Sequence, residues 1–79
     1  MKAQIHVTLK REVLDPQGDA VRRALGSLDL GEVKDVRVGK LIELELATDD
    51  RDVAEKQLTA MCEKLLANPV MEDFRFELL

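Results

Sequence analysis

The stretch Val13-Leu14-Asp15-Pro16-Gln17-Gly18 marks the point where a strand pattern gives way to a helix pattern. Before it, apolar side chains occupy every second position from Ala3 to Leu9, which is the period of a strand with one buried face. Asp15 can cap the first free backbone N–H groups of a helix, and the fixed φ of Pro16 suits the first helical turn. Beyond the stretch, apolar residues recur at helical spacing and predict a helix from about residue 16 to residue 28, at Val21, Ala24, Leu25 and Leu28.

The middle of the chain reads as two strands around Gly39-Lys40. Val36 and Val38 alternate with polar residues on one side of this pair, and the alternation resumes from Ile42 to Leu46 on the other. An odd-length loop or bulge would keep the apolar residues on one face, pairing Val38 with Ile42 and Arg37 with Glu43. We therefore predict a hairpin that leaves Lys40 and Leu41 projecting at its tip.

A second helix and a last strand complete the pattern. Carboxylates at Asp49, Asp50 and Asp52 precede an apolar stripe that ends at Asn68-Pro69, and alternation resumes at Phe74. The order βαββαβ predicts an α+β, ferredoxin-like fold, with a four-stranded antiparallel sheet and both helices on one face. The other face would carry the polar residues of the strands, namely His6, Thr8, Arg37, Glu43, Glu45, Arg75 and Glu77.

Length and composition restrict the classes of function. With 79 residues, we expect a single domain over 1–79 whose thin core favours a homodimer or a larger oligomer. Twelve basic and 16 acidic residues give a net charge of −4 without a basic cluster, which argues against nucleic acid as a partner. No apolar run has the length of a membrane span or a signal peptide. One cysteine rules out a disulfide within the chain, and this fits a cytoplasmic location.

The residue types that carry chemistry are sparse and scattered. His6 and Cys62 would be the only nucleophile and base, but the patterns place them on opposite faces of the sheet. No spacing of cysteine, histidine or carboxylates is typical of a metal site, and the four glycines form no phosphate loop. We expect no catalytic, cofactor-binding or metal-binding residue on this chain.

Three tracts resemble a known family: Val13–Gly18, Val36–Lys40 and Leu65–Phe74. Together they are similar to the PurS subunit of phosphoribosylformylglycinamidine (FGAM) synthase. The resemblance implies a small non-catalytic subunit that bridges a large synthetase subunit, PurL, and a glutaminase subunit, PurQ. It implies a homodimeric scaffold that assists ammonia transfer in purine biosynthesis. The complex, a ligase, would convert formylglycinamide ribonucleotide to formylglycinamidine ribonucleotide with ATP and glutamine, and the large subunit would use the ATP and magnesium.

The exposed turns are the candidate partner interface, because binding residues tend to lie on loops held by a rigid scaffold. The candidates are Asp15, Pro16, Gln17, Gly18, Arg37, Gly39, Lys40 and Leu41. An alternative is a regulatory domain of the ACT type, which shares the βαββαβ order and binds a small molecule at the turn after its first strand. A ferredoxin-like RNA binder is disfavoured because the expected central strands lack stacking aromatic residues.

Overall fold

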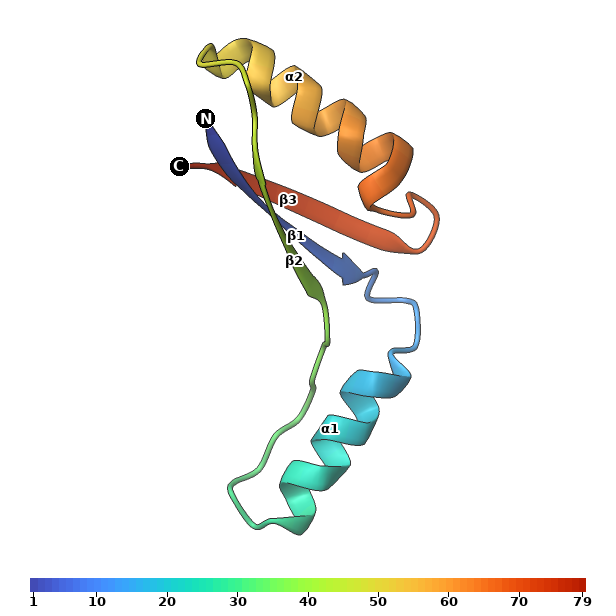
Figure 1. Ribbon diagram of the computed structural model, residues 1–79. Coiled ribbons are helices and arrows are strands. Elements are labelled where there is room, and N and C mark those ends of the chain that lie inside the picture. The colour runs from blue at the N-terminus through green and yellow to red at the C-terminus, as the bar shows by residue number, and fades with distance from the viewer.

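The structure, a computed structural model, describes residues 1–79 and is an α+β chain (Figure 1). Three antiparallel strands form a sheet in the order β2-β1-β3. Two helices accompany them, and the second continues into a π-helical turn, η1. The elements in chain order are β1 (Lys2–Leu9), α1 (Pro16–Ser27), β2 (Lys40–Glu45), α2 (Arg51–Met61), η1 (Cys62–Leu66) and β3 (Glu72–Leu78).

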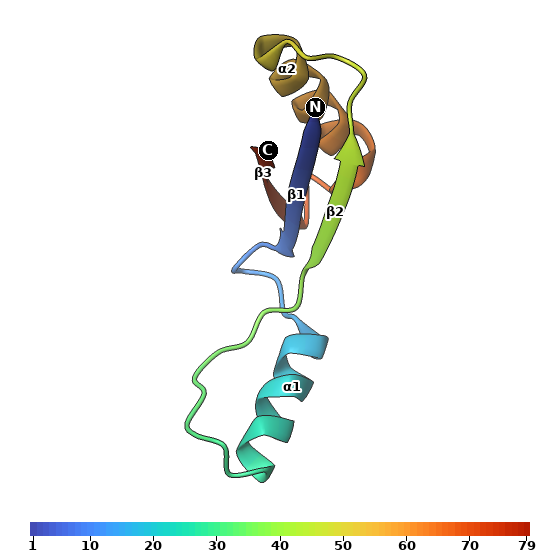
Figure 2. The same cartoon turned by 60° about the vertical axis from the view of Figure 1, so that its left-hand side comes forward.

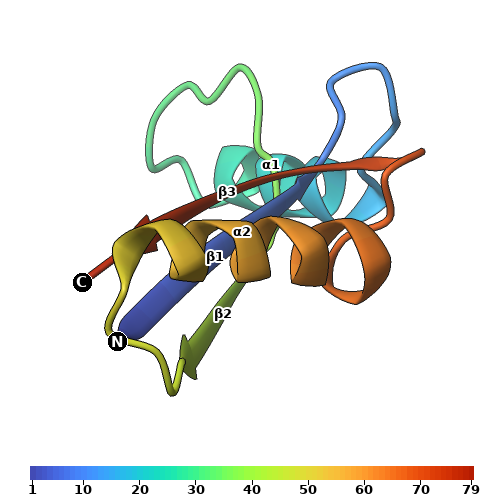
Figure 3. The same cartoon turned by 90° about the horizontal axis from the view of Figure 1, so that it is seen from above.

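The hydrophobic core lies between the sheet and α2, which covers one sheet face (Figure 3). Ile5 at the centre of β1 pairs with Ile42 of β2 and Phe76 of β3 and is fully buried. The predicted alternation is confirmed, since His6 lies opposite Arg75 on the uncovered face. The buried hydrophobic residues are Ala3, Ile5, Val7, Leu46, Ala54, Leu58, Cys62 and Ala67.

The helix α1 does not join this core. Figures 1 and 2 show it beyond the end of the sheet, well away from α2. No buried hydrophobic residue comes from the long stretch between Val7 and Leu46. The radius of gyration is 15.9 Å, whereas a compact chain of this length would have about 12 Å. We call residues 10–39, which comprise α1 and the segments on either side of it, the arm.

The predicted hairpin at Gly39-Lys40 is wrong. The chain runs on from the arm into β2 without reversing (Figure 2), and Lys40 pairs with Val7 of β1 rather than standing at a tip. Val36 and Val38 belong to no strand because they lie beyond the end of β1, where no strand edge is available. Alternation of apolar residues is the same for one continuous strand as for two strands joined by an odd loop. The sheet therefore has three strands, and α2 alone covers it.

Candidate partner-binding site at the base of the arm

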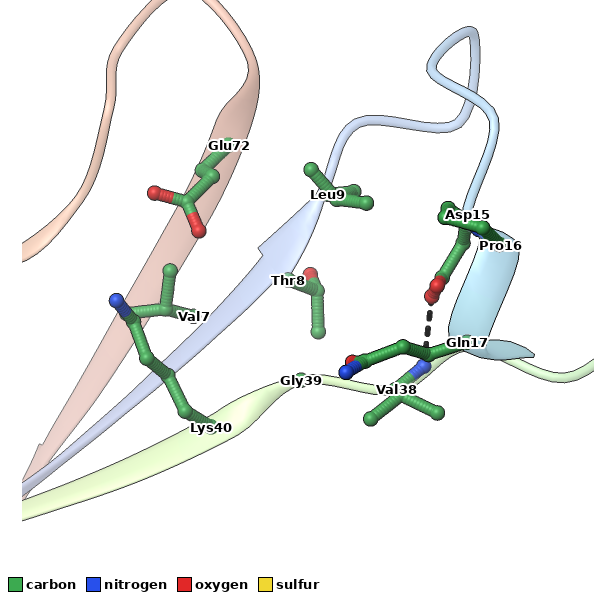
Figure 4. A pocket seen from close by; sticks show the side chains of 10 residues that line it. All are labelled: Val7, Thr8, Leu9, Asp15, Pro16, Gln17, Val38, Gly39, Lys40 and Glu72. Carbon is green, nitrogen blue, oxygen red and sulfur yellow. Dashed lines mark hydrogen bonds between the residues drawn. The ribbon is translucent and has the colours of Figure 1, made fainter. Parts of the chain in front are cut away.

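A cleft of about 430 Å³ lies where β1, the start of α1 and the start of β2 meet (Figure 4). Five of the eight predicted interface residues line it. The lining residues are Val7, Thr8, Leu9, Asp15, Pro16, Gln17, Val38, Gly39, Lys40 and Glu72. Residues 15–17 and 38–40, which are more than twenty positions apart in the sequence, are thus brought to one place.

Asp15 joins these two segments through both of its carboxylate oxygens. Oδ1 accepts a hydrogen bond from the backbone N–H of Gly18 at 2.9 Å, which caps α1 as predicted. Oδ2 accepts one from the N–H of Val38 at 2.8 Å (Figure 4). The side chain is buried, and the N–H donors of Gly18 and Val38 hold the pKa of Asp15 below its ordinary value. Asp15 is therefore an ionised structural acceptor at neutral pH, with one oxygen bonded to each of two backbone N–H groups.

Arg37 strengthens the same junction. Its guanidinium donates to the carbonyl of Val13 at 2.7 Å and to the carbonyl of Arg11 at 3.0 Å. Gly18 lies so close to the returning segment that a Cβ atom there would stand 2.1 Å from the carbonyl oxygen of Val36. Gly18 is accordingly required for close backbone approach. Arg37 and Gly18 support the cleft rather than line it.

Lys40 and Leu41 point to opposite faces at the start of β2. Lys40 shares the face of its partner Val7, lines the cleft and makes no ion pair. Leu41 lies opposite His6 on the uncovered sheet face and is half exposed. Of the predicted interface residues, Leu41 is the one that the fold separates from the others.

The structure also locates the other reactive side chains. Cys62 is fully buried under the sheet, whereas His6 is on the opposite face, as predicted. Burial raises the pKa of the Cys62 thiol, and the Glu63 carboxylate raises it further, so the thiol stays protonated. No cluster of three or more histidine, cysteine or acidic side chains is arranged to hold a metal ion. Asp50 caps α2 by accepting from two backbone N–H groups, and Asp52 lies in the first turn of that helix.

The tract that follows α2 forms the turn between η1 and β3. The side chain of Asn68 accepts from the N–H of Val70 at 3.0 Å, and its backbone N–H donates to Glu72 at 2.7 Å. The carbonyl of Asn68 accepts from the backbone N–H groups of Met71 and Glu72.

No helix is both long and apolar enough to cross a membrane.

Sequence reasoning missed the apolar surface of the arm. The helical stripe of α1 was expected to lie in the core, yet Val21 is 41% exposed and Leu28 is 64% exposed. The spacing of these residues predicted the helix correctly. It could not predict where the helix packs, because periodicity shows which face of a helix is apolar but not which element covers that face. The further exposed apolar residues of the arm are Leu14, Leu30, Val33 and Val38.

Comparison with known proteins accounts for the three tracts. A family model described as PurS, phosphoribosylformylglycinamidine (FGAM) synthase, matches residues 2–79. The chain belongs to the PurS family. The PurS subunit of Bacillus subtilis is 53% identical over 76 residues, which cover 96% of this chain and 89% of that protein. The PurS subunit of Archaeoglobus fulgidus is 39% identical over 74 residues, covering 94% of this chain and 92% of its own length.

Solved structures agree with this assignment. A crystal form of B. subtilis PurS matches with a TM-score of 0.83 at 53% identity, covering 96% of this chain and 94% of that one. The structure of PurLQS from Thermotoga maritima matches with a TM-score of 0.90 at 35% identity, covering 99% and 95%. The chain is thus a subunit of FGAM synthase, EC 6.3.5.3, and serves purine biosynthesis. The family match decides against the ACT-type alternative.

Proposed function

We propose that this chain is the non-catalytic subunit of FGAM synthase that bridges the large synthetase subunit PurL and the glutaminase subunit PurQ. The observation that carries the proposal is the likeness to the T. maritima PurLQS structure over nearly the whole chain. The buried, protonated Cys62 and the remote His6 fit a subunit that contributes shape rather than a nucleophile. Its work in the complex is to hold the other subunits in place and to assist ammonia transfer between them.

The chemistry would then belong to the partners. Glutamine hydrolysis takes place on PurQ, and ATP and magnesium are used by PurL, as the synthase converts formylglycinamide ribonucleotide to formylglycinamidine ribonucleotide. Nucleic acid and membranes have no place in this function, and we assign the chain to the cytoplasm. The net charge of −4 and the absence of a basic cluster argue against nucleic acid as a partner.

The arm supports a homodimer. The outer edge of β2 is unpaired, and the half-buried Ile42 and Leu44 lie on the face covered by α2. A second copy can supply what this sheet lacks: residues 33–38 as a fourth strand beside β2, and α1 as a second helix over that face. The ferredoxin-like, four-stranded arrangement is in this view a property of the dimer.

The cleft at the base of the arm is our candidate surface for PurL or PurQ. Its exposed members Pro16, Gln17 and Lys40 offer apolar, amide and cationic contacts, and Leu41 adds an apolar contact on the adjoining face. Asp15, Gly18, Arg37 and Gly39 hold these contacts in position. Lys40 is the strongest candidate because it is the one basic residue that lines the cleft, and it has no ion-pair partner within the chain.

Reconstitution with PurL and PurQ tests this function. The purified chain alone should release no ammonia from glutamine, and adding it to PurL and PurQ should give a complex on gel filtration and FGAM formation. Lys40→Glu should weaken assembly more at low salt than at high salt, since reversal of a rim charge changes association and its salt dependence. Lys56→Glu on α2, which is also exposed, is the matched control and should assemble normally. A complex that forms and turns over without this chain would refute the bridging role.

A further inference from the structure

We infer that Asp15 is a positioning residue that fixes the direction in which the arm leaves the sheet, and that this direction determines how a second copy docks. The inference deepens the proposed homodimer and rests on it. It begins from the fact that the chain enters and leaves the arm at one place, the cleft of Figure 4.

Asp15 links the outgoing and the returning segments of the arm. One oxygen binds Gly18 in the first turn of α1, and the other binds Val38 just before β2, at 2.9 and 2.8 Å. Arg37 adds two bonds between the same segments, to the carbonyls of Val13 and Arg11. These contacts orient α1 against the start of β2, and no other hydrogen bond of a side chain joins the two segments.

The backbone segments at the base of the arm are closely packed against one another. A Cβ atom on Gly18 would lie 2.1 Å from the Val36 carbonyl oxygen, and a Cβ atom on Gly39 would lie 2.5 Å from the Val7 carbonyl oxygen. Helix α1, the returning segment and β1 are therefore in direct backbone contact around Asp15. Asp15 is only 6% exposed. Its burial shields the two hydrogen bonds of the carboxylate from competition by water.

Beyond the base, nothing in the chain steadies the arm. The far half of α1 and residues 28–35 contribute no buried side chain. A helix of 12 residues is about 18 Å long, so a rotation of about 20° at the base would carry its far end about 6 Å sideways. That displacement exceeds the spacing of about 4.8 Å between neighbouring strands. A small change in angle at Asp15 would thus move the far end of α1 by more than one strand spacing across the sheet face that it has to cover.

Pre-organisation of the arm should then strengthen the dimer. A binding surface that is already in its bound arrangement loses less conformational entropy on association. Asp15→Ser separates this role from capping, because serine is a good N-cap but has a single oxygen. The variant should keep α1 and lose the bond to Val38. Asp50→Ser, at the cap of α2, is the matched control since Asp50 joins no second segment.

Two measurements test the inference. Spin labels at Gly26 on α1 and Asp49 before α2, diluted with unlabelled protein, report distances within one chain by double electron–electron resonance. Both sites are exposed and the buried Cys62 stays unlabelled. Sedimentation equilibrium gives the dimer dissociation constant. We expect a narrow distance distribution for the wild type and Asp50→Ser. Asp15→Ser should give a broad distribution and a dissociation constant raised about tenfold or more.

The outcomes are distinct. An unchanged distance distribution in Asp15→Ser would overturn the positioning role, and a broad distribution with unchanged dimerisation would overturn its link to docking. A monomeric wild type would instead refute the proposed homodimer, while the distances would still report on Asp15. If Asp15→Ser loses the circular dichroism of α1, the isosteric Asp15→Asn replaces it. Its amide can still cap Gly18 but sets an N–H donor against the N–H of Val38.

Discussion

Two glycines in α1 should respond to the same substitution with opposite signs. Gly26 is exposed, and a Cβ atom placed there meets nothing within 4 Å. Gly26→Ala should therefore raise the free energy of unfolding by about 0.5 to 1 kcal/mol, which is the usual gain when alanine replaces glycine in a helix. Gly18 lies in the first turn of the same helix, and helix propensity alone would give Gly18→Ala a similar increase in the free energy of unfolding.

The close approach at Gly18 reverses the result. A Cβ atom there would stand 2.1 Å from the Val36 carbonyl oxygen, whereas ordinary carbon contacts are about 3.5 Å. Relief of an overlap exceeding 1 Å requires one backbone segment to move, because neither atom belongs to a flexible side chain. Overpacking costs about 1–3 kcal/mol, and we expect the upper end here. After the propensity gain of about 1 kcal/mol, Gly18→Ala should lower the free energy of unfolding by about 2 kcal/mol.

Urea denaturation followed by far-ultraviolet circular dichroism measures both variants. Protein concentration has to be the same throughout, because dimerisation couples stability to concentration. A separation of about 3 kcal/mol between the two alanine variants is the expected result. Equal stabilisation by Gly18→Ala and Gly26→Ala would show that the returning segment does not rest on α1, and the rigid base of the arm would be refuted.

Three further predictions follow from burial and charge. Val21→Asp on the arm should raise the dimer dissociation constant by about tenfold or more in sedimentation equilibrium, whereas Val53→Asp on α2, which is equally exposed, should not. Cys62→Ala should cost about 1 to 2 kcal/mol in urea melts through lost packing and leave FGAM formation by the reconstituted complex intact; a folded but inactive complex would show that the thiol has a role. The pKa of Asp15 is lowered on folding, so its stabilisation is present above the unfolded value of 3.8 and is lost as pH falls through the folded pKa. The stability difference between wild type and Asp15→Asn should be constant from about pH 5 to pH 8 and shrink as the pH falls below 3.8, and a difference that grows in acid would contradict the assignment.

Much of the fold could be predicted from local pattern. The alternation from Ala3 to Leu9 gave β1 and its buried face, and Asp15-Pro16 gave the start of α1 to the residue. The carboxylates of Asp49, Asp50 and Asp52 indicated the start of α2, and Asp50 is the residue that caps it. These signals are short-range: a cap, a fixed φ or a side-chain period is decided by neighbours within one turn. The sequence was therefore reliable wherever the physical cause was local.

The fourth strand and the position of α1 were predicted wrongly for one reason. Whether Val36–Val38 turns back on β2 or continues into it depends on which strand edge is free, and that is a long-range property. The apolar stripe of α1 was read as a core face, because an apolar face requires a partner. The pattern does not say whether that partner lies in the same chain or in a second copy.

The candidate residues turned out to be neighbours for reasons of backbone geometry. Five of them line one cleft, yet Asp15, Gly18 and Gly39 are required there by hydrogen bonding and close approach. Sequence reasoning treated them as exposed contacts, since turns carry binding residues more often than cores do. The hydrogen bond between Asp15 and Val38 joins residues 23 positions apart. A contact of this length cannot be predicted from the local sequence pattern.

The geometry at the base of the arm places strict requirements on a few residues of this chain. In a catalytic chain, the constrained positions are nucleophiles, bases and ligands. Here Asp15, Gly18, Arg37 and Gly39 are constrained because they fix one angle between a sheet and a projecting arm. An error of about 20° in that angle would displace the end of α1 by more than one strand spacing. Two of the three tracts by which the chain resembles PurS, Val13–Gly18 and Val36–Lys40, contain these residues.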